Sequence, residues 1–356
     1  MSGNAAIVGA GIFGASLAYR LARDGWDVTL YERHEPGHAR AASGGESRLI
    51  RYAHGPEVWY ARSAWRAREL WRELEAETGR ELMVECGITW FARSGDGWEA
   101  ESESVLRAEG IPVERLAPDA GRELFPSFDP RGIEFILWEP HAGVLRAREA
   151  TLATAEAAQR AGVRLVQAAV TPGEVSADLV VWACGAWLPA LFALPIRVTK
   201  QDVLFFSAEG WETPRVPAWV EYDRAIYGLG DLDGAGVKVA PDLEGPEFDP
   251  EEGERVSSPE TESRARAYLA ERFPALHDAP LAAFTVCQYA LTPDTNFVLA
   301  RHEDQWILGG GSGHGFKHGP ALAEYAARVV TGEEKPLEQF GLGPRERGPS
   351  LRTAGS

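Results

Sequence analysis

A six-residue glycine pattern near the start of the chain places the strongest constraint on its fold. GAGIFG (9–14) follows a short apolar run at residues 4–9 and opens a segment with helical spacing of apolar side chains, and the next apolar run ends in Glu32. In such a strand–helix–strand unit the glycines let the backbone approach a pyrophosphate, and the acid accepts a hydrogen bond from a ribose hydroxyl. The pattern predicts dinucleotide binding, with NAD or FAD favoured over NADP. The alternative is a glycine turn that serves only tight packing.

The charge of the chain narrows the ligands that it can bind. The 356 residues include 53 acidic and 36 basic side chains, for a formal charge of −17. Nucleic-acid binding needs a basic surface, so we do not expect it. An anionic substrate must instead meet a local cluster of cations, because the overall field repels it.

The cysteines and the apolar segments indicate the cellular compartment in which we expect the protein. Cys86, Cys184 and Cys287 are widely spaced, so we expect neither a disulfide framework nor a CxxC metal site, and we assign no metal ligands. Sparse cysteines suit the reducing cytoplasm. The apolar N-terminal run lacks the basic start of a signal peptide, and no stretch is long and apolar enough to span a membrane. We therefore expect a cytoplasmic protein without a membrane partner.

The periodicity of apolar residues alternates along the chain. Segments typical of nucleotide-binding α/β units occur near its start, middle and end, and β-rich segments lie between them. We expect an α/β fold in which a Rossmann-like domain is interleaved with a domain built on a mixed or antiparallel sheet. The first domain is expected to comprise residues 1–82, 143–194 and 296–340, and the second residues 83–142 and 195–295. Residues 341–356, rich in Gly, Pro, Arg and Ser, are expected to form a disordered tail.

The few lysines stand out in a chain that takes its positive charge as arginine. There are 32 arginines and four lysines, and Lys238 in GVKVA and Lys317 in GSGHGFKHG both lie in glycine-rich stretches. A lysine is a compact point charge that an arginine does not replace in a tight site. In AASGGESRLIR, Arg48 and Arg51 are three residues apart, which on a helical turn would direct both into one cleft. Two solvated surface arginines are the alternative.

Taken in order with CGAW (184–187) and CQYALTPD (287–294), these motifs resemble the D-amino-acid-oxidase superfamily of FAD enzymes, and within it the monomeric sarcosine oxidase and N-methyltryptophan oxidase group. The resemblance runs from about residue 5 to residue 335. It implies that the first domain binds FAD and the second the substrate. The residues that it implies for FAD contact are Gly9, Gly11, Ile12, Phe13, Gly14, Glu32, Arg33, Ser43, Gly44, Arg48, Gly185, Trp187, Cys287, Gly313, His314, Gly315, Phe316 and Lys317.

The resemblance also implies roles around the flavin. Cys287 matches the cysteine that is joined through its sulfur to the ring, although a small buried hydrophobe is the commonest fate of a free cysteine. Lys238 matches a lysine that favours reaction with oxygen, since a positive charge stabilises the oxygen anions that develop. Arg48 matches the arginine that lies against the ring. For Lys238 and His314 the alternatives are a surface lysine and a packed, hydrogen-bonded histidine.

The substrate side of the resemblance rests on four residues. Arg51 and Lys317 match the pair that binds a substrate carboxylate, and Tyr227 and Tyr289 match the aromatic walls that accept an alkylated amine. Core tyrosines remain the alternative. The chain departs from the group at Asp242, where a histidine is usual, which puts sarcosine itself in doubt.

A second departure lies between the strands near residues 163 and 181, where the usual β-hairpin has been shortened. We expect this change to alter the outline of the fold more than its chemistry.

The function implied is that of a monomeric oxidase acting on a secondary amine or imino acid with a carboxylate, forming an imine and reducing O2 to H2O2. Alternatives within the fold are a biosynthetic oxidase of a cyclic imino acid and an oxidase of a bulkier amine, which the 12 tryptophans favour. An alternative from a different functional class is a non-catalytic FAD-binding subunit. A flavin dehydrogenase and a flavin-free NAD dehydrogenase are weaker alternatives.

Overall fold

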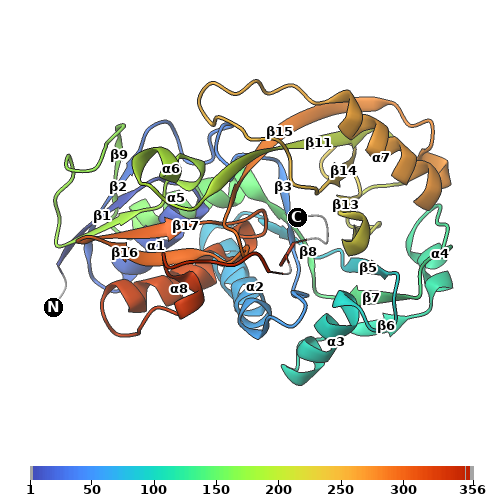
Figure 1. Ribbon diagram of the computed structural model, residues 1–356, viewed down its shortest axis with the longest axis horizontal. Coiled ribbons are helices and arrows are strands. Elements are labelled where there is room, and N and C mark those ends of the chain that lie inside the picture. Colours follow the sequence, from blue (N-terminus) through green and yellow to red (C-terminus); the bar gives the residue numbers. More distant parts are fainter. Residues whose placement is uncertain (1–2, 349, 353–356) are drawn as a thin grey trace.

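The computed structural model describes residues 3–348 and 350–352, and its first layer is a six-stranded sheet with the order β16-β17-β10-β1-β2-β9 (Figure 1). Strands β17, β10, β1, β2 and β9 are parallel, and β16 pairs antiparallel at the edge. Their bounds are β1 (Asn4–Val8), β2 (Asp27–Glu32), β9 (Arg164–Gln167), β10 (Leu179–Trp182), β16 (Val298–His302) and β17 (Gln305–Gly309). The central strands are almost continuously apolar, as expected for a parallel sheet covered on both faces.

Helices rich in small residues cover this sheet. The helix α1 (Ile12–Arg23) packs against α5 (Ala147–Arg160) and α8 (Gly319–Val330), and α2 (Val58–Thr78) packs against α5 and α8. The buried face of α5 consists mainly of alanines, and those of α1 and α8 include glycine, alanine or serine, which allow close approach of the helix axes. The tight packing brings the N-terminus of α1 to the carboxyl edge of the sheet.

The second layer is an eight-stranded, mostly antiparallel sheet with the order β15-β11-β14-β13-β12-β5-β7-β6. Its strands are β5 (Ile88–Ala92), β6 (Glu114–Leu116), β7 (Phe135–Glu139), β11 (Arg197–Phe206), β12 (Ala218–Glu221), β13 (Ile226–Leu229), β14 (Val237–Pro241) and β15 (Leu281–Leu291). Figure 1 shows the long β11–β15 ladder reaching from one half of the molecule to the other. This ladder carries side chains of the second sheet to the edge of the first.

A small sheet joins the two halves. It consists of β3 (Ser47–Ile50), β8 (Gly143–Arg146) and β4 (Met83–Val84), in the order β3-β8-β4. The remaining helices are α3 (Trp98–Ala108), α4 (Gly121–Leu124), α6 (Leu188–Leu191) and α7 (Pro259–Arg272), with 3-10 turns η1 (Pro118–Ala120), η2 (Gly185–Trp187), η3 (Tyr222–Arg224), η4 (Pro274–Leu276), η5 (Phe316–His318) and η6 (Glu338–Phe340).

The α/β architecture expected from the sequence is confirmed. All strands of the six-stranded sheet come from the segments assigned to the first domain, and all strands of the eight-stranded sheet from those assigned to the second. The connection between β9 and β10, residues 168–178, contains no strand. Among the described residues, no helix has the length and apolar character needed to cross a membrane.

The expectation of a disordered tail at residues 341–356 is wrong for the residues that the structure describes. Arg345 forms an ion pair with Asp294 at 2.9 Å, and Leu351 and Arg352 are 4 % and 3 % exposed. The segment is ordered by hydrogen bonds to residues far away in the sequence, including that from the Leu351 amide to the Thr295 hydroxyl at 3.0 Å. Residues 349 and 353–356 of the expected tail lie outside the described residues.

Candidate active site

A cavity of about 320 Å³ opens at the carboxyl edge of the six-stranded sheet. Its walls include Val8 at the end of β1, Glu32 at the end of β2, Ala168 after β9 and Ala183 after β10. The chain continues from β1 to β2 on one side and returns through β10 on the other side of β1. Ligands of open parallel sheets bind at such a reversal of strand order.

The glycine motif forms the floor of this cavity. Gly11 at the start of α1 has no side chain to cap the helix, and the Ser43 hydroxyl accepts from the Ile12 amide at 3.1 Å. The positive end of the helix dipole therefore faces the cavity beside Ser43. The Glu32 carboxylate accepts from the Ala10 amide at 2.7 Å and from the His34 amide at 3.0 Å, which holds it at the tip of β2. This arrangement suits a pyrophosphate beside the helix and a ribose beside the acid.

The large cavity brings together most of the residues expected to contact a cofactor. Of that set, Gly9, Gly11, Ile12, Phe13, Glu32, Arg33, Ser43, Arg48, Gly185, Trp187, Cys287, Gly313, Gly315 and Phe316 line it, whereas Gly14, Gly44, His314 and Lys317 do not. A Cβ on Gly14 would lie 1.9 Å from the Gly9 carbonyl oxygen, and one on Gly44 would lie 2.0 Å from that of His38. These two glycines therefore serve backbone packing below the cavity rather than its wall.

Sequence reasoning missed one wall of the large cavity. Residues 168–171, which follow β9, line it, together with His34 and His38 after β2. The imidazole rings of His34 and His38 stack with their centroids 4.3 Å apart. The position of these residues in the sequence, directly after two strands of the parallel sheet, could have predicted this wall. The carboxyl ends of parallel strands all meet at the same edge of a sheet, where ligands bind.

At the other end of the large cavity, Arg48 and Cys287 lie side by side. Arg48 is on β3 and Cys287 on β15, with 3.3 Å between the Arg48 Nη2 and the Cys287 Sγ. Arg48 also donates to the carbonyls of Ser47 and Ala42 at 2.7 and 2.6 Å. These hydrogen bonds hold the guanidinium in place, so its positive charge lies at the cavity wall next to the thiol.

Lys238 is buried beside this end of the cavity. Its ammonium on β14 donates to the Ser47 carbonyl and hydroxyl at 3.0 and 3.1 Å and lies 5.8 Å from the ring centre of Tyr227. The side chain is 1 % exposed, and burial, helped by the charge of Arg48, lowers the pKa of Lys238 to about 7. It does not line either cavity described here.

A smaller cavity of about 60 Å³ shares Arg48, Tyr289, Gly313 and Phe316 with the large one. Five of the six residues predicted to be catalytic line it, namely Arg48, Arg51, Lys317, Tyr227 and Tyr289, whereas Lys238 does not. The helical interpretation of Arg48 and Arg51 is wrong, because β3 is extended and Arg51 follows its last residue. The two arginines nevertheless reach the same cavity.

Two of the buried cations that line the smaller cavity, Arg51 and Lys317, have lowered pKa values. Arg51 donates to the carbonyls of Ala53 and, at 2.8 Å, Leu351, and Lys317 donates to the His314 carbonyl at 2.7 Å. Burial lowers the pKa of Arg51 to about 10. Burial, and then the charge of Arg51, lower the pKa of Lys317 well below its ordinary value. A bound anion would stabilise the charged forms of both side chains, because an opposite charge offsets the cost of desolvation.

The C-terminal segment contributes a residue that the sequence did not suggest. Arg352 pairs with Asp242 at 2.7 Å and lies 4.9 Å from the ring centre of Tyr289, whose hydroxyl donates to Asp242 at 2.9 Å. Burial raises the pKa of Asp242, and the guanidinium opposes that shift. Both Arg352 and Asp242 line the smaller cavity. The carboxylate that departs from the family pattern therefore has a cationic partner.

Comparison with known proteins agrees with this geometry. Residues 4–329 match the family described as FAD dependent oxidoreductase. The chain is 28% identical over 355 residues to monomeric sarcosine oxidase of Bacillus sp. (strain B-0618), covering 91% of each chain. It is 24% identical to N-methyl-L-tryptophan oxidase of Yersinia pestis (strain Pestoides F), covering 93% of this chain and 96% of that one. Among solved structures, L-proline dehydrogenase from P. horikoshii superposes with a TM-score of 0.83 at 22% identity, covering 96% of each chain.

Proposed function

The chain belongs to the family of FAD-dependent oxidoreductases, and we propose that it oxidises the C–N bond of a small secondary amine or imino acid that carries a carboxylate, with O2 as the electron acceptor and H2O2 as a product. When bound, FAD would take up the two electrons of this oxidation and pass them to oxygen. The relatives named as sarcosine and N-methyltryptophan oxidases support an N-substituted amino acid as the substrate.

The residues of the large cavity fit FAD. Gly11 adds no side chain at the N-terminus of α1, where the Ser43 hydroxyl accepts from the Ile12 amide, and Glu32 lines the cavity at the end of β2, where it could accept from a ribose hydroxyl. Gly185 has a φ of +53° and no atom within 4 Å of its Cβ position, so its backbone is open to close approach by a ligand. The positive charge of Arg48 at the opposite end would stabilise an anionic ring.

The observation that carries the proposal is the buried pair of cations beside two tyrosines in the smaller cavity. Arg51 and Lys317 would hold the substrate carboxylate, and Tyr227 and Tyr289 would flank its amine. In this binding mode the carbon that reacts would lie toward the large cavity, and catalysis would depend mainly on positioning. No side chain of the described cavity has to act as a strong base if the amine binds in its neutral form.

The size of the smaller cavity favours a small substrate over a bulky amine. The 12 tryptophans favoured a bulkier amine as substrate, but all of them lie in the described part of the chain and none lines this cavity. A small N-methyl or cyclic imino acid is therefore the first choice. A non-catalytic FAD-binding subunit remains the contrasting function.

A screen for peroxide formation tests the proposed function. The purified protein would be mixed with N-methyl amino acids, cyclic imino acids and the matching amines that lack a carboxylate, and H2O2 would be measured. We expect turnover with at least one carboxylate-bearing amine and none with its decarboxylated counterpart. If no amine bleaches the flavin under anaerobic conditions, the non-catalytic subunit is the better assignment.

Covalent attachment of FAD through Cys287 is our first prediction. Its thiol lines the large cavity beside Arg48, and Arg48 also lines the smaller cavity. After acid denaturation the flavin is expected to stay with the chain, and Cys287→Ser should release essentially all of it, as seen by fluorescence of the band on a gel. Cys184→Ser is the matched control, because Cys184 lines the same cavity. Flavin that washes out of the unmodified protein would contradict the attachment.

The Arg352–Asp242 pair is expected to set substrate affinity. Arg352→Ala leaves the buried Asp242 carboxylate without its guanidinium, and a negative charge beside the carboxylate site should raise KM on the order of tenfold, equivalent to about 1.4 kcal/mol. The double variant with Asp242→Asn should recover most of the loss, because the negative charge beside the carboxylate site is then gone. A KM that the second change does not improve would show that Arg352 acts only through packing.

We further propose that the enzyme is a cytoplasmic monomer. The three cysteines are free, in keeping with a reducing compartment, and several relatives are named as monomeric enzymes. Gel filtration with light scattering would check the oligomeric state.

A further inference from the structure

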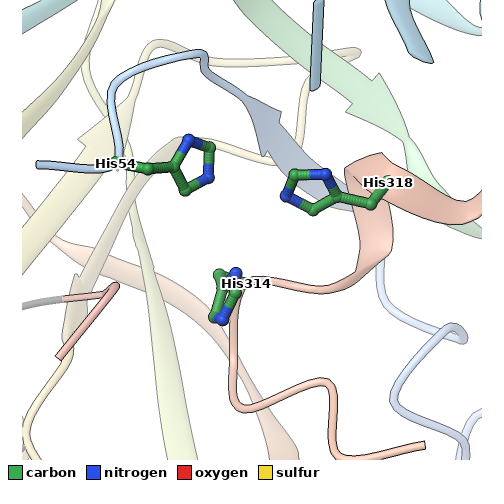
Figure 2. A group of neighbouring side chains, drawn as sticks. All are labelled: His54, His314 and His318. Atoms are coloured by element: carbon green, nitrogen blue, oxygen red, sulfur yellow. The ribbon is translucent and has the colours of Figure 1, made fainter. Parts of the chain in front are cut away.

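Three buried histidines from two segments of the chain meet beside the smaller cavity, which His314 also lines (Figure 2). His54 follows β3, His314 lies in the turn after β17, and His318 ends η5. They are 1 %, 5 % and 0 % exposed, and their ring centres lie 5.3–6.1 Å apart. One nitrogen of each ring lies within 4.8 Å of the other two. Figure 2 shows the three rings turned toward one common space.

Each imidazole has one nitrogen held by an oxygen. His54 Nδ1 lies 2.9 Å from the Tyr52 carbonyl, His314 Nε2 lies 2.9 Å from the Thr295 carbonyl, and His318 Nδ1 lies 3.0 Å from the Ser63 hydroxyl. A carbonyl only accepts hydrogen bonds, so His54 and His314 must donate through these nitrogens. In the neutral rings the other nitrogens, His54 Nε2 and His314 Nδ1, therefore present bare lone pairs.

The remaining nitrogens have no partner among the described residues. His54 Nε2, His314 Nδ1 and His318 Nε2 are all buried without a hydrogen bond. If His318 is protonated on Nε2, it can donate to only one of the two bare nitrogens. Buried acceptors without a partner are costly, so either a metal ion or a hydrogen-bond donor between the rings would stabilise the cluster.

We propose that His54, His314 and His318 form a binding site for one late first-row transition-metal ion, zinc or copper(I), with three imidazole nitrogens as protein ligands. Imidazole suits these ions, whereas magnesium and calcium require oxygen ligands that the cluster does not offer. Metal-binding histidines usually donate their second nitrogen to a carbonyl or similar oxygen, as His54 and His314 do. Zinc–nitrogen bonds of 2.0–2.1 Å place ligand nitrogens about 3.4 Å apart, so the rings would close in by about 1 Å or less.

The charges around the cluster bear on which ion binds. Arg51 and Lys317 act on all three rings, and the acidic group that faces both cations is Glu139, which accepts from the backbone amides of Tyr52 and Ala53. Positive neighbours disfavour a doubly charged ion relative to a singly charged one. The binding of zinc and the binding of copper(I) therefore have to be measured separately.

A metal ion at this position would join the segments that carry the two cations of the substrate site. His54 lies three residues after Arg51, and His318 directly follows Lys317. The ion would fix the distance between these segments and so the geometry of the carboxylate clamp. This consequence rests on the proposed function, whereas metal binding itself does not.

Metal analysis of the holoenzyme tests the site. Flavin-loaded protein would be treated with chelator, incubated separately with Zn²⁺, with Cu⁺ under anaerobic conditions and with Mg²⁺, then desalted and analysed by mass spectrometry. We expect about one zinc or copper per chain and no magnesium. The His54→Gln, His318→Phe double variant should retain at least tenfold less, and His277→Gln, at an exposed histidine, should behave as the unmodified protein.

Anomalous X-ray scattering at the zinc or copper absorption edge keeps the test valid if the double variant does not fold. A peak between the three rings supports the proposal whether or not any amine is oxidised, so failure of the proposed function would be recognised separately. Metal content in the unmodified protein no higher than in the double variant would overturn it, as would equal retention of magnesium. A crystal structure with a water molecule in place of the ion, after incubation with each metal, would also overturn it.

Discussion

Replacing Lys238 with methionine is expected to slow the reaction of the reduced enzyme with oxygen by about 100-fold or more, in line with the loss of one preorganised charge or donor in an active site. Lys238 is 1 % exposed and held by Ser47, so its ammonium is fixed before the reaction begins. Reduction by the substrate should change only a few-fold, because Lys238 does not line the smaller cavity. Stopped-flow measurement of the two half-reactions would separate these effects.

The pH dependence of the oxygen reaction gives a second readout for Lys238. Burial lowers its pKa to about 7, so the protonated fraction falls as the pH rises through this region. If the ammonium is the active form, the rate constant should fall with rising pH in the unmodified enzyme and be flat in Lys238→Met. The exposed Lys335→Met is the matched control for loss of a lysine. Equal slowing of both half-reactions would show that Lys238 has no special role toward oxygen.

The parts of the site that the sequence predicted depend on local patterns. The glycines of residues 9–14 and Glu32 belong to one strand–helix–strand unit, so their spacing already fixes where they lie relative to each other. Cys287 and Lys317 lie within short motifs that resemble those of a known family. The spacing of Arg48 and Arg51 was misleading, because it fits a helical turn equally well and β3 is formed by pairing with β8, far away in the sequence.

The parts that the sequence did not predict depend on contacts between distant segments. Arg352 lies in a stretch of Gly, Pro and Arg without periodicity, and it is ordered by Asp242, 110 residues earlier. The approach of His54 to His314 and His318 likewise depends on how the β3 segment packs against η5. No local pattern records such a pairing, so a basic tail and three separate histidines have no evident function until the chain is folded.

Removing the charge of either Arg51 or Lys317 should weaken the binding of carboxylates strongly. Lys317→Met keeps the length of the side chain and removes its charge, and a charge-assisted hydrogen bond is worth about 1.5–3 kcal/mol, so Kd should rise roughly 10- to 100-fold. Arg51→Ala should have an effect of the same direction. Titration of a competitive carboxylate inhibitor, followed through the flavin spectrum, measures this directly.

The interpretation of the Arg51 variant needs a control for folding. Its guanidinium also donates to the carbonyls of Ala53 and Leu351 and lies 5.1 Å from the ring centre of Trp90, so its loss affects packing as well as charge. Lys317 donates to one carbonyl, that of His314, which makes Lys317→Met the cleaner test. An uncharged analogue of the inhibitor should bind the unmodified enzyme and Lys317→Met equally. If the carboxylate inhibitor also binds both equally, the anion is held elsewhere, and the cations of this cavity serve the cofactor instead.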